Sequence, residues 1–258
     1  MEYDPLKNRL AKWIELFPIL RIGMYKCLDV MLLRQRYVQR EIKGILKNQN
    51  AIKLYDAGAG FCQYSHFVLQ HWQNSIVFAS DLKTDYLQAY AIFAESRFPN
   101  RFSFRGADLQ HFAPKTQYNL ALAIDILEHI PDDLAALQNF YKALSPNGYL
   151  IISTPSDSDE AAKYTEEHVR PGYHKTELET KLQKSGFRIV KSMWTYGFFG
   201  HLAWLLTMKY PTKMAKKGLL LLIPYYLAIL PFAEFLMHLD MILPKSKGTG
   251  ILIVAQKA

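Results

Sequence analysis

The 258-residue chain contains little cysteine, with only Cys27 and Cys62 present. A scaffold of several disulfide bonds is therefore excluded, and a reducing cytoplasm is the compartment that this composition favours. Acidic residues are also outnumbered, because 23 Asp and Glu stand against 31 Lys and Arg and leave a net charge of +8. A chain of this charge is attracted to anionic surfaces, either nucleic acid or membrane headgroups.

The sequence also lacks an apolar run long enough to cross a membrane. The longest uncharged stretch, residues 219–233, has about 15 residues, whereas a spanning helix needs about 20. Pro224 and Pro231 are expected to break any helix in that stretch. The first ten residues, MEYDPLKNRL, are polar and acidic and do not resemble a signal peptide. We therefore expect neither a transmembrane helix nor secretion.

Half of the residues are hydrophobic, which is enough for a large core, and many of them form short apolar runs. Runs of this kind are typical of buried strands in a parallel sheet, and segments with 3.6-residue spacing lie between them. The alternation predicts an α/β fold with a doubly wound sheet. The predicted strands lie within residues 51–58, 75–82, 101–112, 118–133, 148–156, 187–197 and 250–258.

The first predicted strand leads into the turn DAGAG, residues 56–60, and a helix is predicted from Gln63. A strand, a glycine turn and a helix direct backbone N–H groups toward one point. Gly58 and Gly60 let a ligand approach that backbone closely. A dinucleotide-binding turn would have glycine at position 63, so this turn predicts another nucleotide or, alternatively, no ligand.

Acidic residues follow four of the predicted strands. In a doubly wound sheet, the carboxyl ends of parallel strands meet at one edge, where the ligand site lies. A carboxylate at the end of the second strand is placed to bind both hydroxyl groups of a ribose. The four residues are Asp56, Asp81, Asp108 and Asp125.

These motifs together resemble the class I S-adenosylmethionine-dependent methyltransferases, nearest to the small-molecule group that includes quinone-biosynthesis enzymes. The resemblance covers roughly residues 50–196 and rests on DAGAG, SDL, ADL and LEHIPD followed by LSPNGYLIISTP. It implies a Rossmann-like seven-stranded doubly wound sheet with S-adenosylmethionine as cofactor. Many members have a third glycine in the turn where this chain has Cys62.

The resemblance also implies which residues bind the cofactor. Asp56, Gly58 and Gly60 would frame its methionine end, Asp81 and Leu82 would hold the ribose side, and Asp108 with the backbone of Leu109 would meet the adenine. Asp125 and Ile126 would line the floor beside the sulfonium.

The domain organisation departs from that family in one place. We expect a helical N-terminal extension in residues 1–49, a cofactor-binding domain in 50–196 plus 249–258, and an apolar helical insertion in 197–248. In the family, the seventh strand normally follows the sixth at once. The insertion is interpreted as extra core or as a hydrophobic cap over the active site that also touches a bilayer. Its lysines are Lys209, Lys213, Lys216 and Lys217.

Histidines near the predicted pocket are candidates for proton transfer, because histidine titrates near neutral pH. His129 follows the fourth strand, and the loop EHVRPGYH follows the fifth. The predicted catalytic residues are His129, His168 and Tyr173, and the predicted substrate-binding residues are Arg170 and His174. The alternative is that these side chains only pin the loops. No cysteine–histidine spacing predicts a metal site.

The sequence thus predicts a cytoplasmic methyltransferase at the inner face of a membrane. Its acceptor is expected to be a lipophilic small molecule, methylated on a phenol or carboxyl oxygen. Carbon methylation of a quinone-like ring is an alternative, as is a weakly catalytic cofactor-binding partner in a membrane-associated enzyme assembly. A homodimer through the insertion is possible in either case. Nucleic acid is not expected, because the lysines flank leucine-rich helices rather than stacking aromatics.

Overall fold

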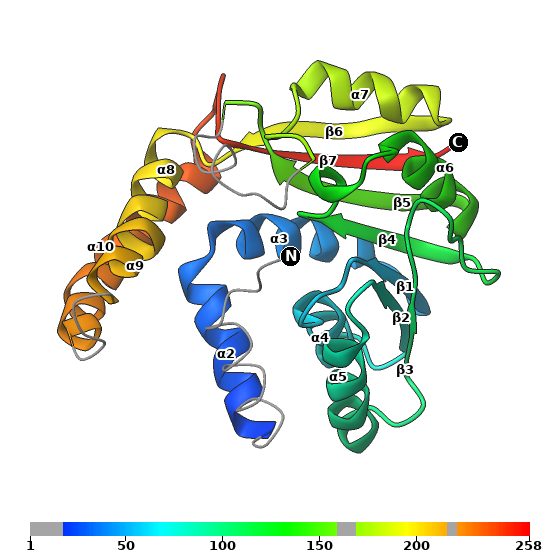
Figure 1. Cartoon of the computed structure of the whole chain (residues 1–258), viewed down its shortest axis with the longest axis horizontal. Helices are drawn as coiled ribbons and strands as arrows, with labels where there is room; N and C mark the ends of the chain where they lie inside the picture. Colours follow the sequence, from blue (N-terminus) through cyan, green and yellow to red (C-terminus); the bar gives the residue numbers. More distant parts are fainter. Residues whose placement is uncertain (1–17, 159–168, 216–220) are drawn as a thin grey trace.

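A seven-stranded sheet forms the centre of the molecule in the computed structural model, which describes residues 18–158, 169–215 and 221–258. The strand order is β3-β2-β1-β4-β5-β7-β6 (Figure 1). Strands β1 to β5 are parallel, and β7 runs antiparallel to both β5 and β6. The strands are β1 (Ile52–Ala57), β2 (Ser75–Asp81), β3 (Phe102–Gly106), β4 (Tyr118–Ile124), β5 (Leu144–Pro155), β6 (Phe187–Thr195) and β7 (Gly250–Lys257). The predicted Rossmann-like fold is confirmed.

Helices cover both faces of this sheet (Figure 1). Because successive residues of a strand point to opposite faces, Leu54 of β1 joins one core cluster and Tyr55 joins the other. Burial on both faces explains the nearly continuous apolar runs in the sequence. One cluster lies under α3 (Leu33–Leu46), α4 (Gln63–His71) and α5 (Thr84–Arg97), and the other under α6 (Asp133–Ala143) and α7 (Lys175–Lys184).

The segment before β1 is helical and reaches the carboxyl end of the sheet. Helix α2 (Pro18–Met31) is followed by α3, which packs against β5 and β7. Tyr25 of α2 donates a hydrogen bond of 2.6 Å to the carbonyl oxygen of Phe61. The N-terminal helices therefore contact both the glycine turn after β1 and the strands β5 and β7 in the other half of the sheet.

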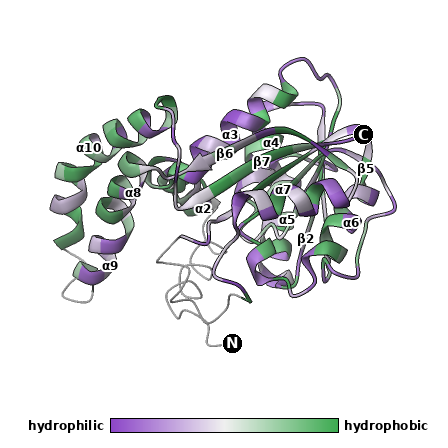
Figure 2. Cartoon of the chain, turned by 90° about the horizontal axis from the view of Figure 1, so that it is seen from above, coloured by the Kyte–Doolittle hydropathy of each residue, from purple (hydrophilic) through white to green (hydrophobic). Residues whose placement is uncertain are grey.

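The insertion between β6 and β7 projects from one end of the sheet as a group of helices (Figures 1 and 2). It consists of α8 (Phe198–Trp204), the π-helix η3 (Leu205–Lys209), α9 (Tyr210–Ala215) and α10 (Leu222–Ile242). Among the described residues, α10 is the one helix long and apolar enough to cross a membrane by length and composition. The core helices of soluble proteins can meet the same criteria.

The prediction that prolines would break this segment is wrong, because α10 runs without interruption through Pro231. Pro224 lies in the first turn, where the backbone N–H groups have no partner within the helix. Pro231 is exposed, and a backbone carbonyl that loses its helical partner costs little beside solvent. Packing of α10 along α8 supplies the remaining stability.

A buried carboxylate joins the insertion to the N-terminal helices. The side chain of Asp240 in α10 is 1% exposed and lies 3.5 Å from the Lys245 ammonium. It accepts hydrogen bonds from the Tyr37 hydroxyl of α3 at 2.8 Å and from the Gly200 backbone N–H of α8 at 3.0 Å. A Cβ on Gly200 would lie 2.8 Å from the Asp240 Cγ, so only glycine fits this junction.

Replacing Asp240 with Ala should lower the free energy of unfolding by about 3–5 kcal/mol, because the Lys245 ammonium loses its charged partner inside the protein and the Gly200 backbone N–H loses its acceptor. Urea unfolding measures this change. Glu234→Gln is the matched control, since Glu234 also pairs α10 with α3 through Arg36 but is 36% exposed. That control should lose less than about 1 kcal/mol. Equal losses in the two variants would contradict the assigned role of Asp240.

Candidate functional site

The glycine turn after β1 is held by the buried Asp56. Its Oδ2 accepts hydrogen bonds from the Ser65 backbone N–H at 3.2 Å and from the Ser65 hydroxyl at 2.7 Å, which ties β1 to the first turn of α4. Burial raises the pKa of Asp56 to about 6. The φ angles of Gly58 and Gly60 are +71° and +50°, values that glycine adopts without steric cost.

The two glycines differ in their surroundings. A Cβ on Gly58 would lie 2.6 Å from Cγ1 of Ile126, so the absence of a side chain lets the turn close onto the loop after β4. A Cβ on Gly60 would meet nothing within 4 Å. The space beside Gly60 is therefore open, and its binding of a cofactor stays a prediction.

The end of β2 lies directly beside this turn. Asp81 Oδ2 accepts a hydrogen bond from the Gly60 backbone N–H at 2.9 Å, and Oδ1 accepts one from the Lys83 backbone N–H at the same distance. The next side chain, Leu82, is 72% exposed. The carboxylate is thus oriented by two backbone amides and keeps lone pairs for another partner.

The loop after β3 is held by hydrogen bonds within the loop and from α6. Asp108 Oδ1 accepts a hydrogen bond from the Gln110 backbone N–H at 2.9 Å. Leu109 is buried, and its carbonyl oxygen accepts a hydrogen bond from the Asn139 side chain of α6 at 3.0 Å. The backbone at Leu109 is therefore held in one position at the carboxyl edge of the sheet.

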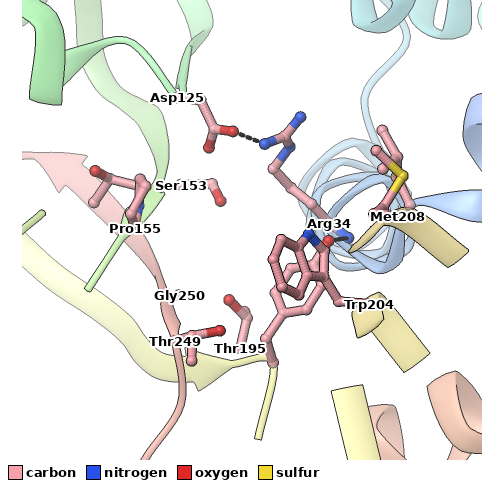
Figure 3. Close-up of a pocket in the computed structure, with 12 residues that line it drawn as sticks. Arg34, Asp125, Ser153, Pro155, Thr195, Trp204, Met208, Thr249 and Gly250 are labelled. Carbon is pink, nitrogen blue, oxygen red and sulfur yellow. Dashed lines mark hydrogen bonds and ion pairs between the residues drawn. The ribbon is translucent and has the colours of Figure 1, made fainter. Parts of the chain in front are cut away.

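Asp125 follows β4 in a strained conformation, with a φ of +48°. Its backbone N–H donates a hydrogen bond of 2.7 Å to the Ser153 carbonyl oxygen of β5. Its carboxylate forms an ion pair with the Arg34 guanidinium of α3, and the two side chains are 29% and 28% exposed (Figure 3). Sequence reasoning missed Arg34, because nothing in the N-terminal segment distinguishes it from the neighbouring arginines.

A cavity of about 270 Å³ opens around this ion pair (Figure 3). Strand ends of β5, β6 and β7 supply one side, which carries hydroxyl groups, and α3 with the insertion supplies the other. Of the residues that line it, Arg34 and Asp125 are the charged ones. The lining consists of Leu32, Arg34, Asp125, Ser153, Thr154, Pro155, Thr195, Tyr196, Trp204, Met208, Thr249 and Gly250.

Arg170 and Tyr173 do not line that cavity, and Tyr173 belongs to the core under α6 and α7. The Tyr173 hydroxyl is buried and donates a hydrogen bond of 2.7 Å to Asp133, which also pairs with Lys181 at 2.7 Å. Arg170 donates to the carbonyl oxygens of Leu127 and Ile130, each at 2.8 Å. These contacts support the alternative in which the two side chains pin the loop after β4.

The electrostatics of Tyr173 lead to the same conclusion. Burial and the hydrogen bond to Asp133 raise the pKa of its hydroxyl, which therefore stays protonated near neutral pH. A phenol in this state is unsuited to act as a general base. These contacts favour a structural role for Tyr173 and Arg170, while the catalytic role of Tyr173 and the substrate contact of Arg170 stay predictions.

The histidines are distributed over several places. His129 ends the short 3-10 helix η1 (Leu127–His129) and is half-buried, and its catalytic role stays a prediction. His174 is exposed at the N-terminus of α7, where its Nδ1 lies 2.8 Å from the Thr176 hydroxyl, so it does not reach the cavity. His168 lies outside the described residues.

A second missed residue is Glu128, which is 1% exposed. It accepts a hydrogen bond from the Thr154 hydroxyl at 3.1 Å, and burial raises its pKa. Its carbonyl oxygen also accepts from the backbone N–H of Val169 at 3.0 Å. Glu128 thereby connects the loop after β4 to β5 and to the loop after β5. The LEHIPD motif contained this residue, but the resemblance assigned it no role.

The chain is similar in sequence to known methyltransferases. A family model described as a methyltransferase domain matches residues 34–192, more than half of the chain. Trans-aconitate 2-methyltransferase of Rhodopseudomonas palustris (strain BisB18) is 26% identical over 108 residues, which are 42% of this chain and 40% of that protein. The match thus spans about two fifths of the length of that relative.

Two solved structures show the same fold. The N-methyltransferase NodS of Bradyrhizobium japonicum, in complex with S-adenosylhomocysteine, is 13% identical with a TM-score of 0.56, covering 89% of this chain and 90% of that one. The phosphoethanolamine N-methyltransferase 2 of Haemonchus contortus, in complex with S-adenosylmethionine, is 14% identical with a TM-score of 0.59, covering 84% of this chain and 51% of that one.

Replacing Tyr173 with Phe should lower the free energy of unfolding by about 1–3 kcal/mol, because a buried hydrogen bond to a charged carboxylate is lost. Urea unfolding tests this, and binding of S-adenosylhomocysteine should stay unchanged. Tyr141→Phe is the control, since that hydroxyl makes only an exposed bond of 3.3 Å to the Ala258 carbonyl oxygen. Unchanged stability together with a large loss of turnover would restore the catalytic interpretation of Tyr173.

Proposed function

The chain belongs to the class I S-adenosylmethionine-dependent methyltransferases, through the methyltransferase-domain family that it matches, and we propose that it methylates a carboxylate oxygen of an acceptor with an apolar part. The observation that carries this proposal is the cavity at the carboxyl end of the sheet, where Arg34 lies beside apolar Trp204 and Met208. The name of the relative from Rhodopseudomonas palustris, a trans-aconitate 2-methyltransferase, agrees with a carboxylate acceptor.

The geometry of the strand ends fits the cofactor of this family. The open space at Gly60 and the Asp81 carboxylate held beside it leave room for an extended ligand along the ends of β1 and β2. We assign the ribose hydroxyls to Asp81, with the exposed Leu82 next to it. Asp56, Gly58 and Gly60 would hold the methionine end, Asp108 and Leu109 the adenine, and Asp125 and Ile126 the region of the sulfonium.

When bound, S-adenosylmethionine supplies an activated methyl group on a positively charged sulfur. The remaining work of the protein is to orient the acceptor and to exclude water. A carboxylate is already ionised at neutral pH and needs no general base, whereas a phenol must lose a proton. Among the described lining residues, Asp125 is the one carboxylate that could accept a proton, and it is already paired with Arg34. This pairing favours a carboxylate acceptor over the phenol that the sequence also suggested.

The apolar part of the acceptor and a membrane location are supported by the exposed side of α10. Leu227, Ile223 and Phe235 are 75%, 62% and 57% exposed. The buried side of the helix carries Ala233, Leu236, Met237 and Asp240, and Asp240 attaches it to α3. A helix that packs on the protein along one side and exposes apolar side chains elsewhere is suited to lie on a bilayer. We propose that this surface faces the cytoplasmic leaflet.

Methyl transfer is tested directly with S-adenosylmethionine labelled in its methyl group and two acceptors that each carry an apolar alkyl tail, octanoate and 4-octylphenol. Octanoate should yield a labelled methyl ester, and 4-octylphenol should react at least tenfold more slowly. Labelling of the phenol alone would contradict the carboxylate assignment. Labelling of neither would contradict the proposed acceptor class.

Replacing Asp81 with Asn should weaken binding of S-adenosylmethionine by about 1–3 kcal/mol, because a charge-assisted hydrogen bond to the ribose is lost. Isothermal titration calorimetry measures the affinity. Glu95→Gln removes the same charge from the exposed surface of α5 and serves as the control. Equal affinities of Asp81→Asn and the wild type would remove Asp81 from the cofactor site.

Binding to liposomes should require anionic lipid and should decrease with salt, because each lysine near an anionic membrane contributes about 1 kcal/mol. Lys209 and Lys213 are exposed at the end of η3 and on α9, while Lys216 and Lys217 lie outside the described residues. Changing all four to Gln should reduce co-sedimentation strongly.

The matched control for this experiment changes Lys142 and Lys184, which are exposed on α6 and α7, and should leave co-sedimentation unchanged. Binding of S-adenosylmethionine should be intact in both sets of variants. Absence of co-sedimentation of the wild-type protein with anionic liposomes at every salt concentration would refute the membrane proposal.

A further inference from the structure

Arg34 is the positively charged residue among those that line the cavity, and it lies on α3 rather than on a strand of the sheet. It is the second residue of α3, and its backbone N–H donates a hydrogen bond of 3.0 Å to the Tyr196 hydroxyl just after β6. That bond fixes the start of α3 at the cavity wall. The side chain then reaches across to Asp125, and with 28% exposure it remains accessible from the cavity (Figure 3).

The hydrogen-bonding capacity of this guanidinium is only partly used. Its Nε is buried and has no hydrogen-bond partner of normal geometry among the described residues. The buried Tyr64 hydroxyl lies near enough to interact with Arg34, but it does not line the cavity. A ligand oxygen in the cavity can accept hydrogen bonds from the guanidinium N–H groups that Asp125 does not occupy.

The balance of charge points to the same kind of ligand. In the described lining, Arg34 and Asp125 neutralise each other. The buried Glu128 also lies close enough to Arg34 to interact with it, although it does not line the cavity. The proposed cofactor adds the positive sulfonium beside Asp125, so Asp125 then faces two positive charges. An anionic acceptor would give Arg34 a partner of its own within the cavity.

We infer that Arg34 is the specificity-determining residue for the acceptor and that its guanidinium exchanges Asp125 for the reacting carboxylate. This inference rests on the proposed function. A guanidinium binds a carboxylate through two parallel N–H groups, which orients both oxygens. In the reaction, a carboxylate oxygen forms the new C–O bond, and the C–S bond breaks with its electron pair on sulfur. No proton moves.

The exchange also accounts for product release. The methyl ester carries no charge, so it no longer competes with the Asp125 carboxylate for Arg34. When the original ion pair re-forms, the ester loses its polar contact and keeps only the apolar ones with residues such as Trp204. The ion pair seen in this structure is thus the state of the pocket before the acceptor arrives and after the ester leaves.

The test measures binding of octanoate and of methyl octanoate by titration calorimetry to the protein saturated with sinefungin, a cofactor analogue whose ammonium group takes the place of the sulfonium charge. The wild type should bind octanoate at least tenfold more tightly than the ester. Arg34→Gln should bind the two probes equally, and Arg34→Lys should keep part of the preference, because an ammonium cannot bind a carboxylate through two parallel bonds. Affinity for S-adenosylhomocysteine should change less than twofold in both variants, which shows that they are folded.

Arg36→Gln is the matched control, because Arg36 lies on the same helix but pairs with Glu234 outside the cavity lining. It should keep the full preference for octanoate. If Arg34→Gln still binds octanoate more tightly than methyl octanoate, the role of Arg34 is overturned. In that case, methyl transfer to octanoate by the wild type would still support the proposed function. A wild type that binds sinefungin but not octanoate would overturn both.

Discussion

The candidate site depends on one buried carboxylate, Asp240, which lies where α10, α8 and α3 meet. Removing a carboxylate from water costs several kcal/mol unless its lone pairs are satisfied, so these helices associate in the arrangement that satisfies it. The Tyr37 hydroxyl, the Gly200 backbone N–H and the Lys245 ammonium meet this requirement together. The same arrangement places Arg34 and Trp204 over the carboxyl end of the sheet, so the acceptor pocket is built by segments that lie outside the cofactor-binding strands.

Three aspartates at the ends of β1, β2 and β4 illustrate how environment differentiates identical side chains. Asp56 is buried, which raises its pKa, and its hydrogen bonds to Ser65 hold the glycine turn. Asp81 is oriented by two backbone amides and keeps lone pairs for a ligand. Asp125 is paired with a guanidinium and sits in a strained backbone conformation, a feature that clusters at functional sites. Only the last of these contacts has to change when an anionic acceptor enters the proposed site.

The insertion shows how a very apolar helix can remain largely unburied. Helix α10 directs Glu234 and Asp240 toward α3, and these charged contacts hold it in place. Side chains such as Leu227 and Phe235 stay exposed on the helix. Exposure of apolar surface on this scale is unfavourable in water, and it favours a contact that covers it. The helix therefore links the pocket, through its attachment to α3, to the surface that we propose faces lipid.

The sequence by itself determined the sheet, the glycine turn at Gly58 and the acidic residues at the strand ends, because these follow from local periodicity and from the way parallel strands share one edge. Only the tertiary structure decided that Arg34 meets Asp125, that Tyr173 is buried beneath α7 and that α10 continues through Pro231. The partner of a side chain depends on where a distant helix packs, and the cost of a proline depends on its exposure. Neither quantity is contained in the local sequence.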